Sequence, residues 1–315
     1  MLHGLFALLV VLTGLLVIAY NRRERSYQQA AIPRGTRVLA VDLGAKRGRG
    51  PLLRDGEWGL VGRTDALLQT REGEVIPVDD KRAWPGYQPG KARPSHLLQL
   101  GAEMLLVSAD PQVRSSPSRG VLRYRDSRGN VIPGGEVRVE NTVQLRTRVL
   151  QVVADIRGAL ASGVEQHRSH STYKKCFRCV HARHCGETLS APVTGPRDRL
   201  GEALDDVILA AEIGPTEDRP MLPEAARLAS EWGHRPPICA SEVGDYCYCA
   251  RSWWLRRRGL RPTSAALLAG NQMHGRTGIE LLRVIWLTRV CKALVWASVT
   301  VTAVTLLAFV LGSAH

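Results

Sequence analysis

The sequence is short of acidic residues relative to basic ones. It contains 29 Asp and Glu residues against 43 Lys and Arg residues, so its formal net charge at pH 7 is +14. A strongly basic chain favours polyanionic partners, which are either nucleic acid or an anionic membrane surface. Charge alone does not choose between these two classes.

Charged residues are missing from both ends of the chain. Residues 2–20 and residues 293–313 contain no Asp, Glu, Lys or Arg. Each run has about the 20 residues that a helix needs to cross a bilayer. The first run also lacks the basic segment that precedes the apolar part of a cleaved signal peptide. We therefore predict an uncleaved transmembrane helix over residues 1–21 and a second one over residues 293–313.

Basic residues flank each apolar run on one side only. Three arginines within residues 22–25 follow the first run, and three basic residues within residues 283–292 precede the second. Basic residues accumulate on the cytoplasmic side of transmembrane helices. We therefore expect the membrane-anchored chain to hold residues 22–292 in the cytoplasm, with both short termini outside.

Cysteine is scarce and clustered, which argues against a disulfide framework. Three of the seven cysteines, Cys176, Cys179 and Cys185, form a CxxC-x5-C motif. In a reducing cytoplasm, clustered cysteines more often bind metal or are catalytic than form disulfides. Three thiolates are one short of a tetrahedral zinc site or a cubane cluster. His181 or His184 would complete a zinc site, whereas a fourth cysteine would favour iron–sulfur.

Between the apolar ends, composition divides the chain into four segments. A basic juxtamembrane segment with a first strand covers residues 22–58, and a core that ends in the cysteine triplet covers residues 59–190. A connecting segment follows over residues 191–237, and a helical segment over residues 238–292. Periodicity and turn signals predict a strand over residues 37–43, a hairpin over residues 59–81 and a helix over residues 96–108. They also predict a strand pair over residues 120–140 and a second helix over residues 142–162. Two more helices are expected, over residues 241–258 and from about residue 264 into the second apolar run.

Chemically active side chains gather in the hairpin. Asp65 ends one expected strand, and Asp79 and Lys81 lie on the next. Residues two apart on a strand project from the same face, and a residue on the neighbouring strand can converge with them. Two carboxylates would hold a Mg²⁺ or Mn²⁺ ion that activates water at a phosphodiester, and Lys81 would orient that water or stabilise the transition-state charge. The alternative is a solvated turn with charged residues.

Two further segments match a known pattern. Residues 241–259 read SEVGDYCYCARSWWLRRRG, and residues 270–274 read GNQMH. Together with the Asp65 hairpin, the helix that carries Gln99 and the cysteine triplet, they resemble the CRISPR-associated RecB-like exonucleases, the Cas four family of the PD-(D/E)XK nuclease superfamily. The motifs stand in circularly permuted order, because the segments that open the family's sequence come last here.

The resemblance implies an α/β fold of the restriction-endonuclease-like type, a mixed sheet flanked by helices, with a helical iron–sulfur subdomain. It implies a metal-dependent DNA nuclease, by analogy an exonuclease on single-stranded ends or flaps. Lys81 would be the catalytic base or electrostatic stabiliser, and Gln99 would position substrate or water. The implied ligands of Mg²⁺ or Mn²⁺ are His274, Asp65, Asp79 and the backbone carbonyl of Asp80. Those of a structural [4Fe–4S] cluster are Cys176, Cys179, Cys185 and Cys249.

The match departs from the family at three positions. Ala250 replaces the usual proline, Asp79 stands where glutamate is more usual, and Glu103 occupies the position of a tyrosine four residues after Gln99. These departures leave open a catalytically inactive, membrane-tethered nucleic-acid-binding protein that keeps a cluster or zinc. A zinc-stabilised membrane scaffold without DNA contact is a further alternative.

The expected helix over residues 241–258 is both basic and aromatic. Its residues Arg251, Arg256 and Arg257 would line a path for the DNA backbone, and Trp253 would stack on a base. The alternatives are a basic face near anionic lipid for the arginines and a packing role for the tryptophan.

Overall fold

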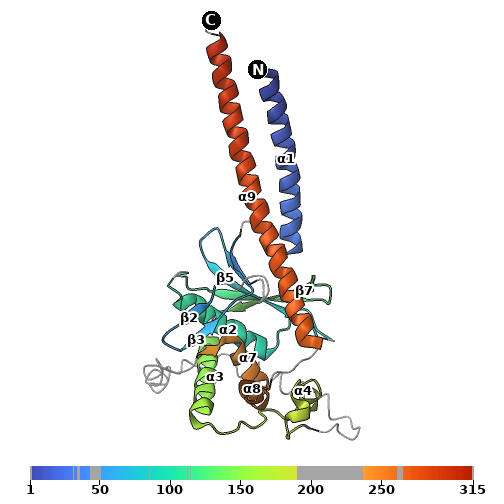
Figure 1. The fold of residues 1–315 in the computed structure, drawn as a ribbon. Helices are drawn as coiled ribbons and strands as arrows, with labels where there is room; N and C mark the ends of the chain where they lie inside the picture. The colour runs from blue at the N-terminus through green and yellow to red at the C-terminus, as the bar shows by residue number, and fades with distance from the viewer. Residues whose placement is uncertain are drawn as a thin grey trace.

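The computed structural model is a mixed α/β fold with one long apolar helix at each end (Figure 1). It describes residues 2–30, 32–33, 36–42, 51–84, 86–111, 113, 115–189, 237–260 and 265–313. The side chains of residues 265–277 are not among those described.

Five strands form the main sheet. They lie side by side in the order β1 (Arg37–Val41), β4 (Ala66–Gln69), β5 (Val75–Arg82), β6 (Arg119–Arg125) and β7 (Val131–Glu140). Strands β5 and β6 run parallel, and the other neighbouring pairs are antiparallel. A parallel pair needs a crossover connection, which includes helix α2 (Pro94–Ala109) here.

A smaller sheet joins two distant parts of the chain. Strands β2 (Leu53–Asp55) and β3 (Leu60–Gly62) are antiparallel, and β8 (Ile238–Cys239) pairs in parallel with β3. The segment that follows residue 237 is thereby brought back beside the segment that leads into β4.

Helices cover one face of the main sheet. Helix α2 begins with a proline in its first turn, where the missing N–H costs no helical hydrogen bond. Its residues Leu98 and Met104 share a core with Leu67 and Val75 of the sheet. Helix α3 (Val143–Ser162) packs on the same core, and Thr142 caps it by accepting the Leu145 N–H at 3.2 Å.

Two short helices follow β8, and the first of them packs beside α2. Helix α7 (Ala240–Tyr248) approaches α2 most closely at Gly244, where an added Cβ atom would lie 2.7 Å from the Ser95 carbonyl oxygen. This approach requires glycine. Helix α8 (Ala250–Arg257) comes next. Beside it lies the segment of residues 173–185, here called the cysteine loop, which contains α4 (Tyr173–Phe177) and the 3-10 turn η1 (Ala182–His184).

The opposite face of the main sheet packs against the end helices, α1 (Leu2–Gln29) and α9 (Ala265–Ser313). A second core combines strand residues with residues from the end of α1 and from α9; it includes Ile76, Val78, Tyr27, Ala30, Leu281 and Val284. The two end helices also touch each other, because Arg23 Nε donates to Thr288 Oγ1 at 3.2 Å. The end of α1 and a stretch of α9 are therefore part of the folded core, and the two helices lie side by side (Figure 1).

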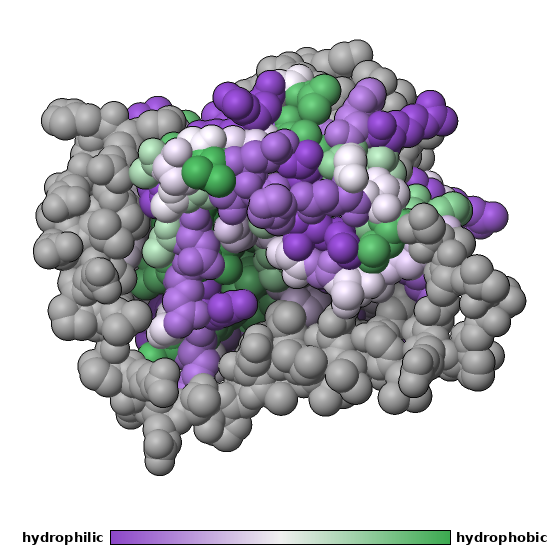
Figure 2. Space-filling view, turned by 90° about the horizontal axis from the view of Figure 1, so that it is seen from below, coloured by the Kyte–Doolittle hydropathy of each residue, from purple (hydrophilic) through white to green (hydrophobic). Residues whose placement is uncertain are grey.

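Both end helices contain stretches long and apolar enough to cross a membrane, over Gly4–Gln28 and Gly278–Val310. Large apolar side chains lie on their outer surfaces, such as Phe6 at 68% and Trp296 at 72% exposure. Lipid would cover such surfaces at no cost, whereas water penalises them. Seen from the end away from these helices, the described surface is mainly hydrophilic (Figure 2).

The structure confirms most of the elements expected from periodicity and corrects two of them. The run predicted as the first strand of the hairpin, over residues 60–70, is divided between β3 and β4, which belong to different sheets. The single helix predicted over residues 241–258 is broken into α7 and α8 at Cys249, whose φ of −166° is extended backbone. The connecting segment predicted over residues 191–237 lies outside the described residues except for its last residue.

Candidate functional site

The acidic hairpin places its functional groups on the sheet face that α2 covers. Asp79 and Lys81 lie on β5 and alternate with Asp80, so they project from one face and Asp80 from the other. Lys81 Nζ lies 2.9 Å from Asp79 Oδ2, and Asp79 is only 3% exposed. Asp65, the residue before β4, accepts the Asp80 N–H through Oδ2 at 2.6 Å. The three predicted residues therefore come together as expected.

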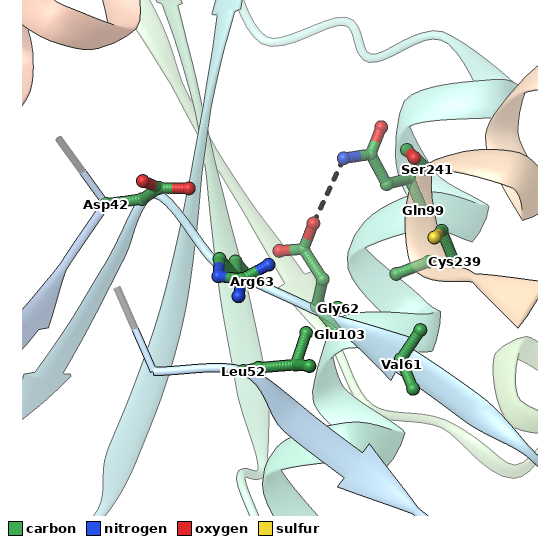
Figure 3. Close-up of a pocket in the computed structure, with 10 residues that line it drawn as sticks. Asp42, Leu52, Val61, Gly62, Arg63, Gln99, Glu103, Cys239 and Ser241 are labelled. Carbon is green, nitrogen blue, oxygen red and sulfur yellow. Dashed lines mark hydrogen bonds between the residues drawn. The ribbon is translucent and has the colours of Figure 1, made fainter. Parts of the chain in front are cut away.

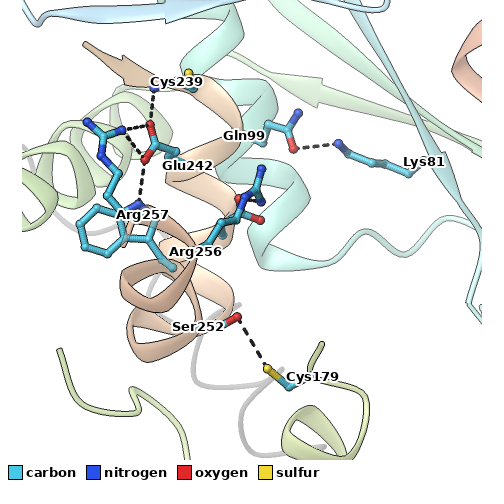
Figure 4. Close-up of polar contacts among 10 residues, drawn as sticks. Lys81, Gln99, Cys179, Cys239, Glu242, Ser252, Arg256 and Arg257 are labelled. Carbon is cyan, nitrogen blue, oxygen red and sulfur yellow. Dashed lines mark hydrogen bonds and ion pairs between the residues drawn. The ribbon is translucent and has the colours of Figure 1, made fainter. Parts of the chain in front are cut away.

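The helix α2 adds two polar groups to this side. Lys81 Nζ donates to Gln99 Oε1 at 2.7 Å (Figure 4), and Gln99 Nε2 donates to Glu103 Oε1 at 3.0 Å (Figure 3). Residues four apart on a helix lie on the same face, which is why Gln99 can contact both Lys81 of the strand and Glu103 of its own helix. The result is a continuous chain of contacts from Asp79 through Lys81 and Gln99 to Glu103.

The side chain and the backbone of Asp80 have different partners, because the side chain projects from a face of the sheet and the backbone groups point along the sheet to the neighbouring strands. Its carboxylate is fully buried and pairs with Arg123 at 3.0 Å and with Arg125 at 2.7 Å. Its backbone N–H points to Asp65, and the N–H and C=O of one strand residue face the same neighbouring strand. The pairing of β4 with β5 ends at Ala66 and Val78, so the Asp80 carbonyl faces the Asp65 side where that pairing has stopped.

Burial and neighbouring charges set the protonation of the site. Burial opposes the charged form of Lys81, but the carboxyl groups of Asp79, Glu103 and Asp65 more than offset it, so its pKa is raised. Burial, reinforced by Asp79 and Asp65, raises the pKa of Glu103 well above its usual value despite the opposing influence of Lys81 and Gln99. Lys81 is therefore an ammonium at neutral pH, which suits electrostatic stabilisation better than proton abstraction.

A pocket of about 290 Å³ opens beside the Gln99 and Glu103 end of the site (Figure 3). Its polar lining comes from the residues that follow β1 and β3, from α2, and from β8 and the start of α7; it includes Asp42, Arg63, Gln99, Glu103, Cys239 and Ser241. Segments that are far apart in the sequence thus line the same pocket.

His274 lies in helix α9, but its side chain is outside the described residues. Its predicted role as a metal ligand therefore stays a prediction. The helix itself contacts β1 and β5, the strands on either side of β4.

The cysteine loop packs against the junction of α7 and α8 (Figure 4). Arg251 donates through Nε and Nη2 to the Cys185 carbonyl oxygen at 3.1 and 3.0 Å, and Cys179 Sγ lies 3.6 Å from Ser252 Oγ. Burial raises the pKa of the Cys249 thiol, and its proximity to Cys179 raises it further. The fourth predicted cysteine therefore lies at the loop that carries the other three, although about 70 residues separate them in sequence.

Within the part of the chain that the structure describes, no three His, Cys, Asp or Glu side chains are already arranged as a metal site. The donor chemistry nevertheless fits the two predicted groups. Hard carboxylate and carbonyl oxygens from Asp65, Asp79 and Asp80 suit Mg²⁺ or Mn²⁺. Thiols drawn from two packed segments suit iron–sulfur or zinc, and His181, which is 2% exposed, belongs to the same loop.

The residues predicted to contact nucleic acid have other partners. Trp253 is 1% exposed and its Nε1 donates to Glu242 at 3.0 Å, so its ring packs in the core and does not present a face to a base. Arg257 pairs with the same carboxylate at 2.8 Å, and Arg251 holds the cysteine loop. Arg256, half exposed and paired with Asp245, is the most accessible of the three arginines.

The part that Glu103 plays in this hydrogen-bond network was not predicted from the sequence. Its position one helical turn after Gln99 was the available signal, because that spacing puts both side chains on one face. Comparisons of the chain with protein-family models, curated proteins and solved structures find no match.

Proposed function

We propose that this chain is a membrane-anchored, metal-dependent DNA nuclease of the PD-(D/E)XK class, with its motifs in circularly permuted order. The observation that carries the proposal is the meeting of Asp65, Asp79, Lys81 and Gln99 on one side of the sheet. An acid on one strand and an acid-x-Lys on its partner, with a glutamine from the following helix, is the arrangement that the resemblance requires.

The chain's own residues divide the reaction between binding and charge stabilisation. Asp65, Asp79 and the Asp80 carbonyl, joined by His274, would hold Mg²⁺ or Mn²⁺, and the bound ion would supply Lewis acidity for activating water at a phosphodiester. Lys81 offers a fixed ammonium to the negative charge that develops on the phosphate oxygens. Gln99 keeps Lys81 Nζ beside Asp79, so that little reorganisation is needed during the reaction.

The cysteines have a structural role in this proposal. Cys176, Cys179, Cys185 and Cys249 would hold a [4Fe–4S] cluster, which would tie the cysteine loop to the junction of α7 and α8. The contacts between Arg251 and the Cys185 carbonyl oxygen and between Cys179 and Ser252 already hold these segments together. None of the roles assigned to the site needs an electron, so the cluster acts as a clamp.

The permutation is supported by how the segments pack. The family's opening segment corresponds here to α7 and α8, which touch both the cysteine loop and the helix that carries Gln99. Two parts of the chain that are far apart in sequence thus complete one domain.

The proposed substrate is single-stranded DNA, at ends or flaps, processed in the cytoplasm close to the membrane. The basic composition supports a polyanionic substrate, and the basic flanks of the two apolar helices support a cytoplasmic position for residues 22–292 with both termini outside.

One comparison tests the nuclease assignment. The detergent-solubilised protein should degrade end-labelled single-stranded DNA with Mg²⁺ or Mn²⁺ and not with EDTA. Lys81→Ala should lose at least about a hundredfold in kcat, because it removes a preorganised charge from the site. The exposed Lys91→Ala is the matched control. Equal cleavage by Lys81→Ala and wild type would refute the assignment, and DNA binding without cleavage by the wild type would favour the inactive binding protein.

A further inference from the structure

Glu103 occupies a central place in the network although it replaces the expected tyrosine. It is 1% exposed, and its Oε1 accepts a hydrogen bond from Gln99 Nε2 at 3.0 Å (Figure 3). Gln99 in turn accepts the 2.7 Å hydrogen bond from Lys81 Nζ through its Oε1. Glu103 and Lys81 are thus linked through the Gln99 amide group, which donates to Glu103 at its nitrogen end and accepts from Lys81 at its oxygen end.

An amide group of this kind has a donor end and an acceptor end, and rotation by 180° exchanges them. In the observed orientation, each end of the Gln99 amide meets a complementary partner. The rotated amide would turn its N–H donors towards the Lys81 ammonium, which has no acceptor to offer. Lys81 and Glu103 together therefore select one of the two orientations.

The neighbouring helix limits the other movements of Gln99. Gly244 of α7 lies so close that an added Cβ atom would be 3.3 Å from Gln99 Cβ and 3.6 Å from its Oε1. The glutamine is thus confined between α7 on one side and Glu103 on its own helix.

We propose that Glu103 is a positioning residue: by accepting from the Gln99 amide, it fixes the carbonyl oxygen that holds Lys81 Nζ beside Asp79. This inference rests on the proposed nuclease function and adds to it a residue that the family pattern does not supply. The Glu103 carboxyl group acts through Gln99 and not through contact with substrate.

The direct test compares Glu103→Leu with Glu103→Gln. Leucine fills the space but accepts no hydrogen bond, so kcat on single-stranded DNA should fall about 10- to 100-fold with KM changed less than about twofold, as for a misplaced catalytic group. Glutamine still offers a carbonyl oxygen and should keep most of the activity. Glu140→Leu, at the exposed end of β7, should behave as wild type.

A double-mutant cycle shows whether Glu103 acts through Gln99. If it does, Glu103→Leu should cost little in a Gln99→Ala background, because the amide that it orients is already gone. Equal losses from Glu103→Leu in both backgrounds, or an unchanged kcat in the single variant, would overturn the proposal.

A second readout does not depend on catalysis. In protein labelled with ¹⁵N-glutamine, the Gln99 side-chain amide is identified by the signal that Gln99→Ala removes. Its hydrogen exchange should be slow in the wild type and at least about tenfold faster in Glu103→Leu at matched thermal stability, because a buried donor has lost its acceptor. Unchanged exchange would refute the positioning role. If the Lys81→Ala comparison refutes the nuclease assignment, the hydrogen-exchange comparison by itself still tests whether Glu103 positions Gln99.

Discussion

Asp80 pairs with two arginines in the interior, and Asp80→Ala would leave both of their charges without an anionic partner. The three side chains are at most 1% exposed. Each arginine keeps one carbonyl contact, Arg123 with Ala30 at 2.5 Å and Arg125 with Gly129 at 2.7 Å. Two buried cations would then depend on neutral acceptors alone.

The expected loss of stability follows from this burial. Removing one partner of a buried ion pair costs about 3–5 kcal/mol. Because the remaining carbonyl contacts offset part of the loss, we expect about 3 kcal/mol. For a domain of this size, each kcal/mol lowers Tm by about 2–4 °C, so the Tm of Asp80→Ala should be roughly 6–12 °C lower.

The assay is thermal unfolding of the detergent-solubilised protein at neutral pH, followed by circular dichroism. The matched control is Glu136→Ala, which breaks an exposed pair with Arg138 at 4.0 Å. An exposed pair contributes about 1 kcal/mol or less, so this Tm should fall by less than about 4 °C. Replacing Asp80, Arg123 and Arg125 together by apolar residues of similar size should recover most of the loss, because no buried charge remains. The reasoning fails if Asp80→Ala and Glu136→Ala unfold at the same temperature.

Two further predictions concern the cofactor and the membrane. Protein purified without oxygen should be brown, and Cys249→Ser should lose this colour while the exposed Cys239→Ser keeps it; colourless protein with one zinc ion per chain would contradict the cluster. Reporter domains fused to either terminus should report a position outside the cytoplasm, and a cytoplasmic signal at either end would contradict the predicted topology.

Local rules were sufficient to predict much of the candidate site. Strand periodicity put Asp79 and Lys81 on one face, and the hairpin brought Asp65 beside them. The glutamine was expected on the helix that follows, and helix α2 carries it to Lys81. These contacts depend on short stretches of chain whose geometry the sequence pattern indicates.

Contacts between distant segments were not predictable in the same way. The sequence shows Arg123 and Arg125 as charges on a strand, but only the packing of β5 against β6 explains why they lie buried around Asp80. Likewise, the sequence pattern of the helix did not show whether the Trp253 side chain would be buried in the core or exposed to a ligand. Such outcomes depend on how whole elements pack, which no local signal specifies.

The end helices enter the same core as the sheet, and this limits how the domain can move. Tyr27 and Ala30 on one side, and Leu281 and Val284 on the other, pack on Ile76 and Val78 of the strand that carries the candidate site. A domain joined to its anchors by a flexible linker can take many heights and orientations above a bilayer. A domain that packs directly on its anchoring helices keeps one height and one tilt. With both helices inserted in a membrane, the domain would move only in the plane of that membrane, and a substrate of the proposed nuclease would have to reach the membrane surface.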